Sequence, residues 1–556
     1  MPYIRFAERD TEMNVPRPHW AVNFLLLKSV SRERLSERSG AEMKNLSRRV
    51  WVGLVLTSVL CGAARGQGAN PTRAEKTAEE STAATVIENV TVITPERKGP
   101  LEHATVMIRD GRIAEVGTNL KTASDVKRID GRGKFLIPGL IDTHVHVGEL
   151  APLDDDGIEA HPELVQALRA QIPLSFLAFG FTTIVDLNIV PGTLGWFNAA
   201  PFHPSLFHCG PAARIPGGYT AQRAPKDAEA AKRMNLVYDK AHEKEWPANL
   251  DPQDFTPERA VERAAATGAI CVKTFVEPGF GGVFHWPVPS AETLAAMRAA
   301  VKKRGMIFVV HANGVEGWQA ALNAHTDVIA HGLWHWPGDR QSIVPGDEAK
   351  RIVSAAARAQ IGVQPTMQVV YGERSVFDRS ILDDPRLAQA LPRSVIDYLK
   401  SDPGKAAWQA TADEYKQAIA RVFSSSVEPT KAMAIAGARV SATTHLLQIE
   451  GGRLLFGSDT PSGEGIGNPQ GLNGRLELEK WFAAGVPLAQ ILRAATLENA
   501  KAFGLEKDRG TIEIGKRADL LLLSVDPLKT VKAYDAIERI FLGGEEIVPK
   551  DLLPMN

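Results

Sequence analysis

The chain of 556 residues is too long for one ordinary domain and long enough to bury a large core. Its 44% hydrophobic and 23% charged residues are typical of a soluble globular protein, and a formal net charge of −1 gives no reason to expect nucleic acid or an anionic membrane as a partner. The three cysteines, Cys61, Cys209 and Cys271, form neither a disulfide framework nor a C-x-x-C metal spacing.

The N-terminal segment has the pattern of a targeting sequence. After Met43, a basic stretch precedes an uncharged apolar run from Val50 to Leu60 and then small residues, the order of a secretory signal peptide; a buried helix start is the alternative. We interpret residues 43–66 as a signal peptide, residues 1–42 as a non-native or removed extension, and residues 67–84 as a flexible linker. The mature protein is then exported, periplasmic or extracellular, with no stable membrane span. The choice between Sec and twin-arginine export stays open.

Short β-rich runs follow at both ends of the mature chain. The first set covers residues 85–94, 104–109 and 112–116, and Asp110-Gly111 is a strong hairpin signal between the last two. The second set covers residues 510–514, 519–523 and 537–541. We expect residues 85–137 and 506–556 to pair into one small β-sandwich domain, with the rest of the chain inserted in it.

Between these ends, apolar strand-like runs alternate with longer helical segments over residues 138–505. This alternation predicts an α/β fold, a parallel (β/α)8 TIM barrel. Residues from about 378 to 448 are mostly helix-patterned and form an insertion, either a lid over the barrel mouth or a peripheral decoration. The strand-like runs include 182–185, 269–275, 306–310, 328–330, 362–363 and 454–456, and the helical segments include 257–267, 291–304, 315–323 and 347–359.

Two histidines stand two residues apart at the end of the first barrel strand. Successive side chains of a strand point to opposite faces, so His144 and His146 point to the same face. The end of a barrel strand is the catalytic mouth, where two convergent imidazoles can chelate a divalent metal. The H-x-H spacing is weak evidence by itself.

Four later strand-like runs also end in residues able to bind a metal: Lys273, His311, His331 and Asp459. A single such residue is usually structural. Polar residues at the same ends of five strands are hard to dismiss, because buried polar groups need partners. The strand ends therefore predict a metal site.

Together these residues resemble the ligand set of binuclear members of the amidohydrolase superfamily, which is His-x-His, Lys, His, His and Asp. The local sequences are similar too: PGLIDTHVH from Pro138, AHG from Ala330, FGSD from Phe456 and GTIEIGKRADL from Gly510. The resemblance covers roughly residues 85–549 and leans toward the imidazolonepropionase-like and prolidase-like amidohydrolases.

This resemblance implies two divalent metal ions. His144, His146 and Asp459 would bind the more buried ion, and His311 and His331 the second. Zinc fits these ligands best, although manganese, cobalt or iron would also bind.

The resemblance also implies that Lys273 is carboxylated on its amine and bridges both ions, because two close dications need an anionic bridge; a snorkelling lysine is the alternative. A hydroxide between the ions would attack a carbonyl, with Asp459 as general base and acid and His331 as a second catalytic residue. The reaction would be hydrolysis of a C–N bond in a small amide, cyclic amide or dipeptide-like substrate, with an ester also open. A homo-oligomer is left open.

Two rival functions are weighed against this one. A mononuclear deaminase of the same superfamily lacks the bridging lysine and carries a glutamate three residues after the fifth-strand histidine. Here Gly314 occupies that position, and Glu316 is out of register. A catalytically inactive binding protein on the same scaffold usually loses ligands, and none is missing from this sequence.

Three residues near the expected mouth are candidates for substrate contact: Tyr219, Tyr371 and His335. Either tyrosine could donate a hydrogen bond to a developing oxyanion, and loop packing is the alternative for each. Strand parity places Cys271 on the same face as Lys273, so we expect it in the barrel interior as a small apolar group.

Overall fold

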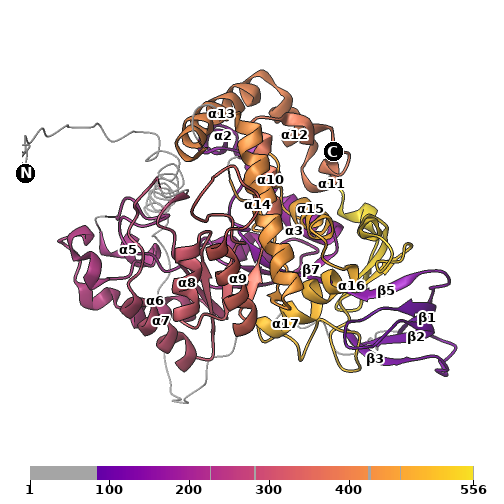
Figure 1. Cartoon of the computed structure of the whole chain (residues 1–556). Coiled ribbons are helices and arrows are strands. Elements are labelled where there is room, and N and C mark those ends of the chain that lie inside the picture. Colours follow the sequence, from indigo (N-terminus) through magenta and orange to yellow (C-terminus); the bar gives the residue numbers. More distant parts are fainter. Residues whose placement is uncertain (1–83, 226, 281–282, 424–426, 464, 555–556) are drawn as a thin grey trace, which may run out of the picture. The chain divides into compact units, whose positions relative to one another are not determined.

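The structure is a computed structural model that describes residues 84–554 except 226, 281–282, 424–426 and 464 (Figure 1). The predicted extension and signal peptide, and the linker up to residue 83, lie outside the described residues. Within the described part of the chain, no helix combines the length and the apolar character needed to cross a bilayer.

Strands from both ends of the described chain share one sheet. Its order is β16-β15-β14-β5-β1-β2-β3, with β4 paired to β1. The two ends meet where β14 pairs antiparallel with β5, and Leu520 lies opposite Pro138. The two ends therefore pair as the sequence predicts. The bounds are β1 (Thr85–Val92), β2 (Leu101–Arg109), β3 (Arg112–Gly117), β4 (Lys127–Asp130), β5 (Phe135–Pro138), β14 (Leu520–Leu523), β15 (Ile537–Leu542) and β16 (Glu545–Ile547).

An apolar cluster joins the two ends of the chain in this sheet. Ile87 and Val106 from the N-terminal strands pack in one cluster with Leu520 and Phe541 from the C-terminal strands. All four are buried, and burial of each such side chain stabilises the fold by roughly 1.5–3 kcal/mol. Neither end has this core without the other.

The predicted hairpin between β2 and β3 is confirmed. The strands pair antiparallel up to Arg109 and Arg112. Asp110 and Gly111 between them have φ values of 52° and 73°. Two successive residues in the left-handed region are what a two-residue hairpin turn requires, and Asp-Gly meets that need at low cost.

The strand predicted at residues 510–514 is wrong. Gly510 and Gly515 have φ values of 91° and 88°, which break an extended run at both ends. The Ile512 N–H donates to the Thr94 hydroxyl, and the Gly515 N–H donates to the Ile113 carbonyl. The segment is held by these separate bonds, and β14 begins only at Leu520.

Two parallel sheets are formed by the middle of the chain. One has the order β13-β12-β11-β10-β9 and the other the order β6-β7-β8. Backbone hydrogen bonds also link them: Ile270 N–H donates to the His208 carbonyl, and His146 N–H donates to the Thr460 carbonyl. The bounds are β6 (Leu140–Val145), β7 (Phe181–Asp186), β8 (Ser205–His208), β9 (Cys271–Phe275), β10 (Ile307–His311), β11 (Val328–Ala330), β12 (Gly362–Gln364) and β13 (Arg453–Leu454).

Helices lie between these strands in the chain, as predicted, and Figure 1 shows α6 to α9 grouped beside one another. Local signals fix their starts: the Thr256 hydroxyl accepts the Arg259 N–H before α6, and the Ser290 hydroxyl accepts the Thr293 N–H before α7. The bounds are α2 (Asp155–Ala160), α3 (Pro162–Ala178), α4 (Thr193–Asn198), α5 (Ala228–Arg233), α6 (Pro257–Ala265), α7 (Ala291–Lys303), α8 (Val315–Asn323), α9 (Asp347–Ala359), α10 (Met367–Gly372), α15 (Leu472–Ala483), α16 (Leu488–Arg493) and α17 (Asn499–Ala502).

The predicted insertion is helical. Between β12 and β13 the chain forms a 3-10 turn at Arg379–Asp383 and then α11 (Leu387–Ala390), α12 (Arg393–Lys400), α13 (Asp402–Phe423) and α14 (Pro429–Ile449). Helix α14 packs against α9, α10 and α13, so the insertion is anchored to the elements that surround the parallel strands.

Candidate metal centre

His144 and His146 lie at the end of β6, and both are buried. The strand is fixed by Asp142, whose Oδ1 accepts the backbone N–H groups of His144 at 3.1 Å and Ser458 at 3.0 Å. One buried carboxylate therefore ties the His-x-His segment to the segment that carries Asp459.

Asp459 is the point on which the two histidines converge. Its Oδ1 lies 2.9 Å from His144 Nε2 and 3.0 Å from His146 Nε2. The backbone of Asp459 has a φ of 58°, a left-handed conformation that is unusual for a residue other than glycine. Such conformations persist where the surrounding fold enforces them, often at functional sites.

His331 follows β11 and approaches Asp459 from another strand. Its Nδ1 lies 3.6 Å from Asp459 Oδ2 and 2.9 Å from the Thr366 hydroxyl. His331 also has a positive φ of 82°. One ligand atom from each of His144, His331 and Asp459 can be chosen so that all three lie within 4.8 Å of one another.

Lys273 on β9 and His311 on β10 border this group. Lys273 Nζ lies 3.0 Å from His144 Nε2, and both side chains are buried. The His311 ring lies 4.4 Å from the His331 ring, centre to centre. The structure thus gathers all six predicted ligand residues, each in contact with another member of the set.

Burial dominates the electrostatics of the group. It lowers the pKa of His144 to about 3 and holds the pKa of His331 well below its usual range. For Asp459 burial acts in the opposite sense, but His144 and His331 overcome it and hold the carboxyl pKa well below its usual range. His144 and His331 are therefore neutral and Asp459 is ionised near pH 7, the protonation states that metal ligands need.

These residues fit a divalent cation. Neutral imidazole nitrogens and a carboxylate are ligands of zinc and of several other transition metals. Asp459 supplies negative charge beside the imidazole rings, and Lys273 is the cation within this group. The donor set is consistent with the metal site that the sequence predicts.

Of the two tyrosines predicted to contact substrate, one lies beside the candidate centre and the other lies on a helix. The Tyr219 ring stacks on the His311 ring at 4.8 Å, so it lies beside the candidate centre. Tyr371 instead lies on α10, with its hydroxyl 3.2 Å from the Ser441 hydroxyl and Lys480 Nζ 4.5 Å from its ring centre.

His335 lies in a cluster of aromatic residues near Asn313. Its ring centre is 3.6 Å from that of Trp334 and 6.0 Å from that of Phe280. Its backbone N–H donates to the Asn313 carbonyl at 3.0 Å.

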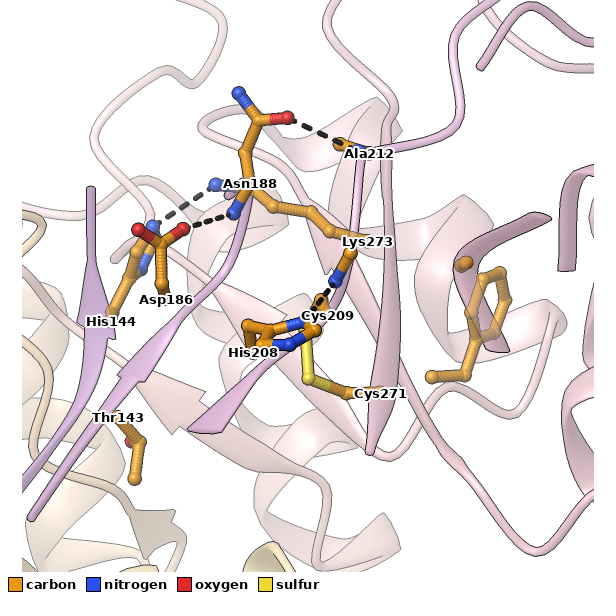
Figure 2. Close-up of a disulfide and its surroundings, with 12 residues drawn as sticks. Thr143, His144, Asp186, Asn188, His208, Cys209, Ala212, Cys271 and Lys273 are labelled. Atoms are coloured by element: carbon orange, nitrogen blue, oxygen red, sulfur yellow. Dashed lines mark hydrogen bonds between the residues drawn. A yellow bond between two sulfur atoms is a disulfide. The ribbon is translucent and has the colours of Figure 1, made fainter. Parts of the chain in front are cut away.

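The prediction for Cys271 is wrong in its chemistry. Cys271 lies in the apolar interior as expected, but it forms a disulfide bond with Cys209, and both residues are fully buried. Figure 2 shows Cys271 on the same strand as Lys273 and Cys209 next to His208 on the neighbouring strand. Two cysteines that are 62 residues apart meet because β8 and β9 are neighbours, which spacing alone does not reveal.

Two further residues, Glu277 and Asn313, contact His311 and were not among the predicted site residues. Glu277 Oε2 lies 3.6 Å from His311 Nε2, and Asn313 Nδ2 lies 3.1 Å from the same nitrogen. Glu277 and Asn313 each lie two residues beyond the end of their strand, β9 and β10, where strand parity no longer applies, so no pattern in the sequence pointed to them.

Short stretches of the chain are similar in sequence to dihydroorotases. A dihydroorotase of Trichlorobacter lovleyi is 35% identical over 79 residues, 14% of this chain and 16% of that protein. A dihydroorotase of Syntrophotalea carbinolica is 39% identical over 99 residues, 18% of this chain and 20% of that protein. The matches thus span about a fifth or less of these relatives.

The likeness of fold extends much further than the likeness of sequence. A crystal structure of a Xaa-Pro dipeptidase with bound methionine superposes with a TM-score of 0.57 at 20% sequence identity, covering 84% of this chain and 100% of that one. The model of the amidohydrolase family matches residues 264–544, about half of the chain, which include His311, His331 and Asp459. The chain therefore belongs to the amidohydrolase family.

Proposed function

We propose that the protein is a metal-dependent hydrolase that breaks a C–N bond in a small amide, cyclic amide or dipeptide-like substrate. The observation that carries this proposal is the buried convergence of His144, His331 and Asp459, with ligand atoms within 4.8 Å of one another. Membership of the amidohydrolase family supports it. The fold likeness to a Xaa-Pro dipeptidase favours dipeptide-like substrates as the first to test.

We propose two metal ions, with zinc as the first choice. His144, His146 and Asp459 would hold one ion, and His311 and His331 the other. When bound, such ions polarise a carbonyl and lower the pKa of water toward neutrality.

Lys273 is suited to become the anionic bridge between the two ions. Burial lowers the pKa of its amine to about 8, so the neutral form is readily available near neutral pH. The amine nitrogen can then form a bond to the carbon of CO2 and release a proton, which leaves a carbamate anion. This change replaces a cation by an anion between the two sets of ligands.

Asp459 and Tyr219 are proposed to move or hold protons. Asp459 is ionised, so it can accept a proton and return it to the leaving nitrogen. Burial raises the pKa of Tyr219, so its hydroxyl stays protonated and can donate to the substrate carbonyl oxygen. His331, whose Nδ1 lies 2.9 Å from the Thr366 hydroxyl and 3.6 Å from Asp459 Oδ2, is the second proposed catalytic residue.

We propose that the eight parallel strands close into a (β/α)8 barrel and that the mixed sheet of the two chain ends forms a β-sandwich beside it. The backbone bonds that link β8 to β9, and β6 to the segment after β13, support barrel closure. In such a barrel the candidate centre lies at the carboxyl ends of the strands, the usual catalytic face.

We also propose export to an oxidising compartment. The Cys209–Cys271 disulfide supports this, because such bonds persist mainly in secreted and periplasmic proteins. Expression in the native host followed by N-terminal sequencing tests it. A mature chain beginning near Gln67 is expected, whereas an intact Met1 in the cytoplasmic fraction would contradict it.

The function is tested with purified protein loaded with zinc. Elemental analysis gives the number of ions per chain, and amine release is followed across a panel of dipeptides, lactams and N-acyl amino acids. We expect the wild-type protein to hydrolyse a substrate of this panel and Asp459→Asn to abolish that activity. Asp519→Asn should preserve it, since Asp519 is a buried carboxylate beside the mixed sheet of the two chain ends. One ion with ammonia release from ring amines would indicate a deaminase. No turnover with any substrate would indicate a binding protein.

A further inference from the structure

A buried polar network lies against His311 on the side of its Nε2 atom. Glu277 is 2% exposed, its Oε1 accepts the Gly279 N–H at 2.9 Å, and its Oε2 accepts an Asn313 amide N–H at 3.1 Å. The same Oε2 lies 3.6 Å from His311 Nε2. These hydrogen bonds fix the position of the Glu277 carboxylate beside the His311 ring.

The orientation of the Asn313 amide is fixed by its other end. Its Oδ1 accepts the indole N–H of Trp334 at 3.1 Å, and an indole nitrogen can only donate. Nδ2 is therefore the end that faces Glu277 and His311. An amide nitrogen donates hydrogen bonds but does not accept them, so Asn313 Nδ2 cannot accept a hydrogen bond from His311.

Only one neighbour of Nε2 in this network, Glu277, can therefore accept a proton from His311. A neutral histidine that binds a metal through Nδ1 carries its proton on Nε2, and that proton needs an acceptor. The Asn313 amide alone would favour the opposite tautomer, in which Nδ1 carries the proton and is blocked.

We propose that Glu277 is a positioning residue that holds His311 in the tautomer whose Nδ1 binds metal, with Asn313 and Trp334 fixing the carboxylate beside it. The proposal rests on the proposed function, because it assumes that His311 is a ligand. Partners of this kind orient metal-binding histidines in many sites, and their loss typically weakens metal binding about 10–100-fold.

The test is a zinc titration of metal-free full-length mature protein in competition with a chromophoric chelator, which gives the number of ions and each dissociation constant. We expect Glu277→Gln to weaken one ion about 10–100-fold and to leave the other unchanged. Glu477→Gln is the matched control, since Glu477 is also buried and also accepts a backbone N–H, from Met367, and a side-chain N–H, from the Trp481 indole. It should change neither constant.

Two further variants make the result specific. In a His311→Ala background, Glu277→Gln should have no additional effect, because the ligand that it positions is gone. If Glu277→Gln does not fold, Glu277→Asp keeps the charge but withdraws it by one methylene, and we expect a smaller weakening of the same ion.

Two outcomes must be kept apart. A wild-type protein that binds no zinc refutes the proposed function itself. If the wild-type protein binds two ions but Glu277→Gln and Glu277→Asp leave both dissociation constants unchanged, only the role of Glu277 is refuted. The same holds if the loss of affinity caused by Glu277→Gln adds to that caused by His311→Ala.

Discussion

The disulfide bond between β8 and β9 allows a quantitative prediction. Replacing both Cys209 and Cys271 by alanine removes a cross-link that closes a loop of 62 residues. The loop-entropy relation for that length gives about 4 kcal/mol of lost stability at 25 °C. The bond is fully buried among apolar side chains, so two small voids add to this cost rather than offset it.

The assay is urea unfolding followed by tryptophan fluorescence at neutral pH. We expect the double alanine variant to unfold at a lower urea midpoint, equivalent to about 4 kcal/mol at an unchanged slope. Wild-type protein in urea with a reductant is the control. Its bond is reduced only in molecules that have unfolded, so at equilibrium its transition should move toward that of the variant.

The burial of the disulfide bond leads to a second expected result. Reductant added to the folded protein should leave the bond intact, because neither sulfur is accessible. Mass spectrometry of unreduced peptides reads this directly. A loss below about 1 kcal/mol, or peptides that are not cross-linked in protein from an oxidising host, would refute the reasoning.

Three other variants test separate features. Lys273→Ala should reduce bound zinc by at least one ion per chain, measured by elemental analysis. It should also lower kcat/KM by more than the roughly 100-fold typical of losing a residue that only positions a ligand. Full metal content in this variant would contradict the bridging role of Lys273. Burial raises the pKa of Glu477 to about 7. Its protonated form therefore contributes roughly 3 kcal/mol to the free energy of unfolding, which is fully present below pH 4.5 and is lost as the pH rises through 7. Glu477→Gln should therefore unfold with a flatter pH dependence between pH 5 and 8, and an unchanged dependence would contradict this. Trp318→Ala should cost roughly 3–5 kcal/mol in urea unfolding, because Trp318 is fully buried and its indole N–H donates to the Ala312 carbonyl; Trp318→Phe should cost clearly less.

Local patterns predicted the features that local physics determines. The Asp110-Gly111 turn needed only two residues that tolerate positive φ, and the structure has them there. Helix α7 was expected over residues 291–304 and runs from Ala291 to Lys303, because the Ser290 cap and the following helix formers set its start. Strand parity placed His144 and His146 on one face, and both contact the same oxygen of Asp459.

Features that depend on neighbours distant in sequence could not be read in the same way. The Cys209–Cys271 bond depends on which strands are adjacent, and two cysteines in an otherwise cysteine-poor chain give no such information. The partners of His311 depend on the path of the chain beyond β9 and β10, where no periodic pattern exists. The segment from Gly510 has strand-forming residues, but its glycines with positive φ and its bonds to Thr94 and Ile113 decide its conformation.

The pairing of β5 with β14 has a consequence for the order of events during biosynthesis. β5 leaves the ribosome early, whereas Leu520 to Leu523 follow only after nearly all the remaining chain. Until then, the edge of β5 that β14 will occupy has unpaired backbone N–H and C=O groups, and such edges promote aggregation. Completion of this sheet is therefore expected to be a late step. A chain truncated before Leu520 would keep its N-terminal strands as a permanent open edge.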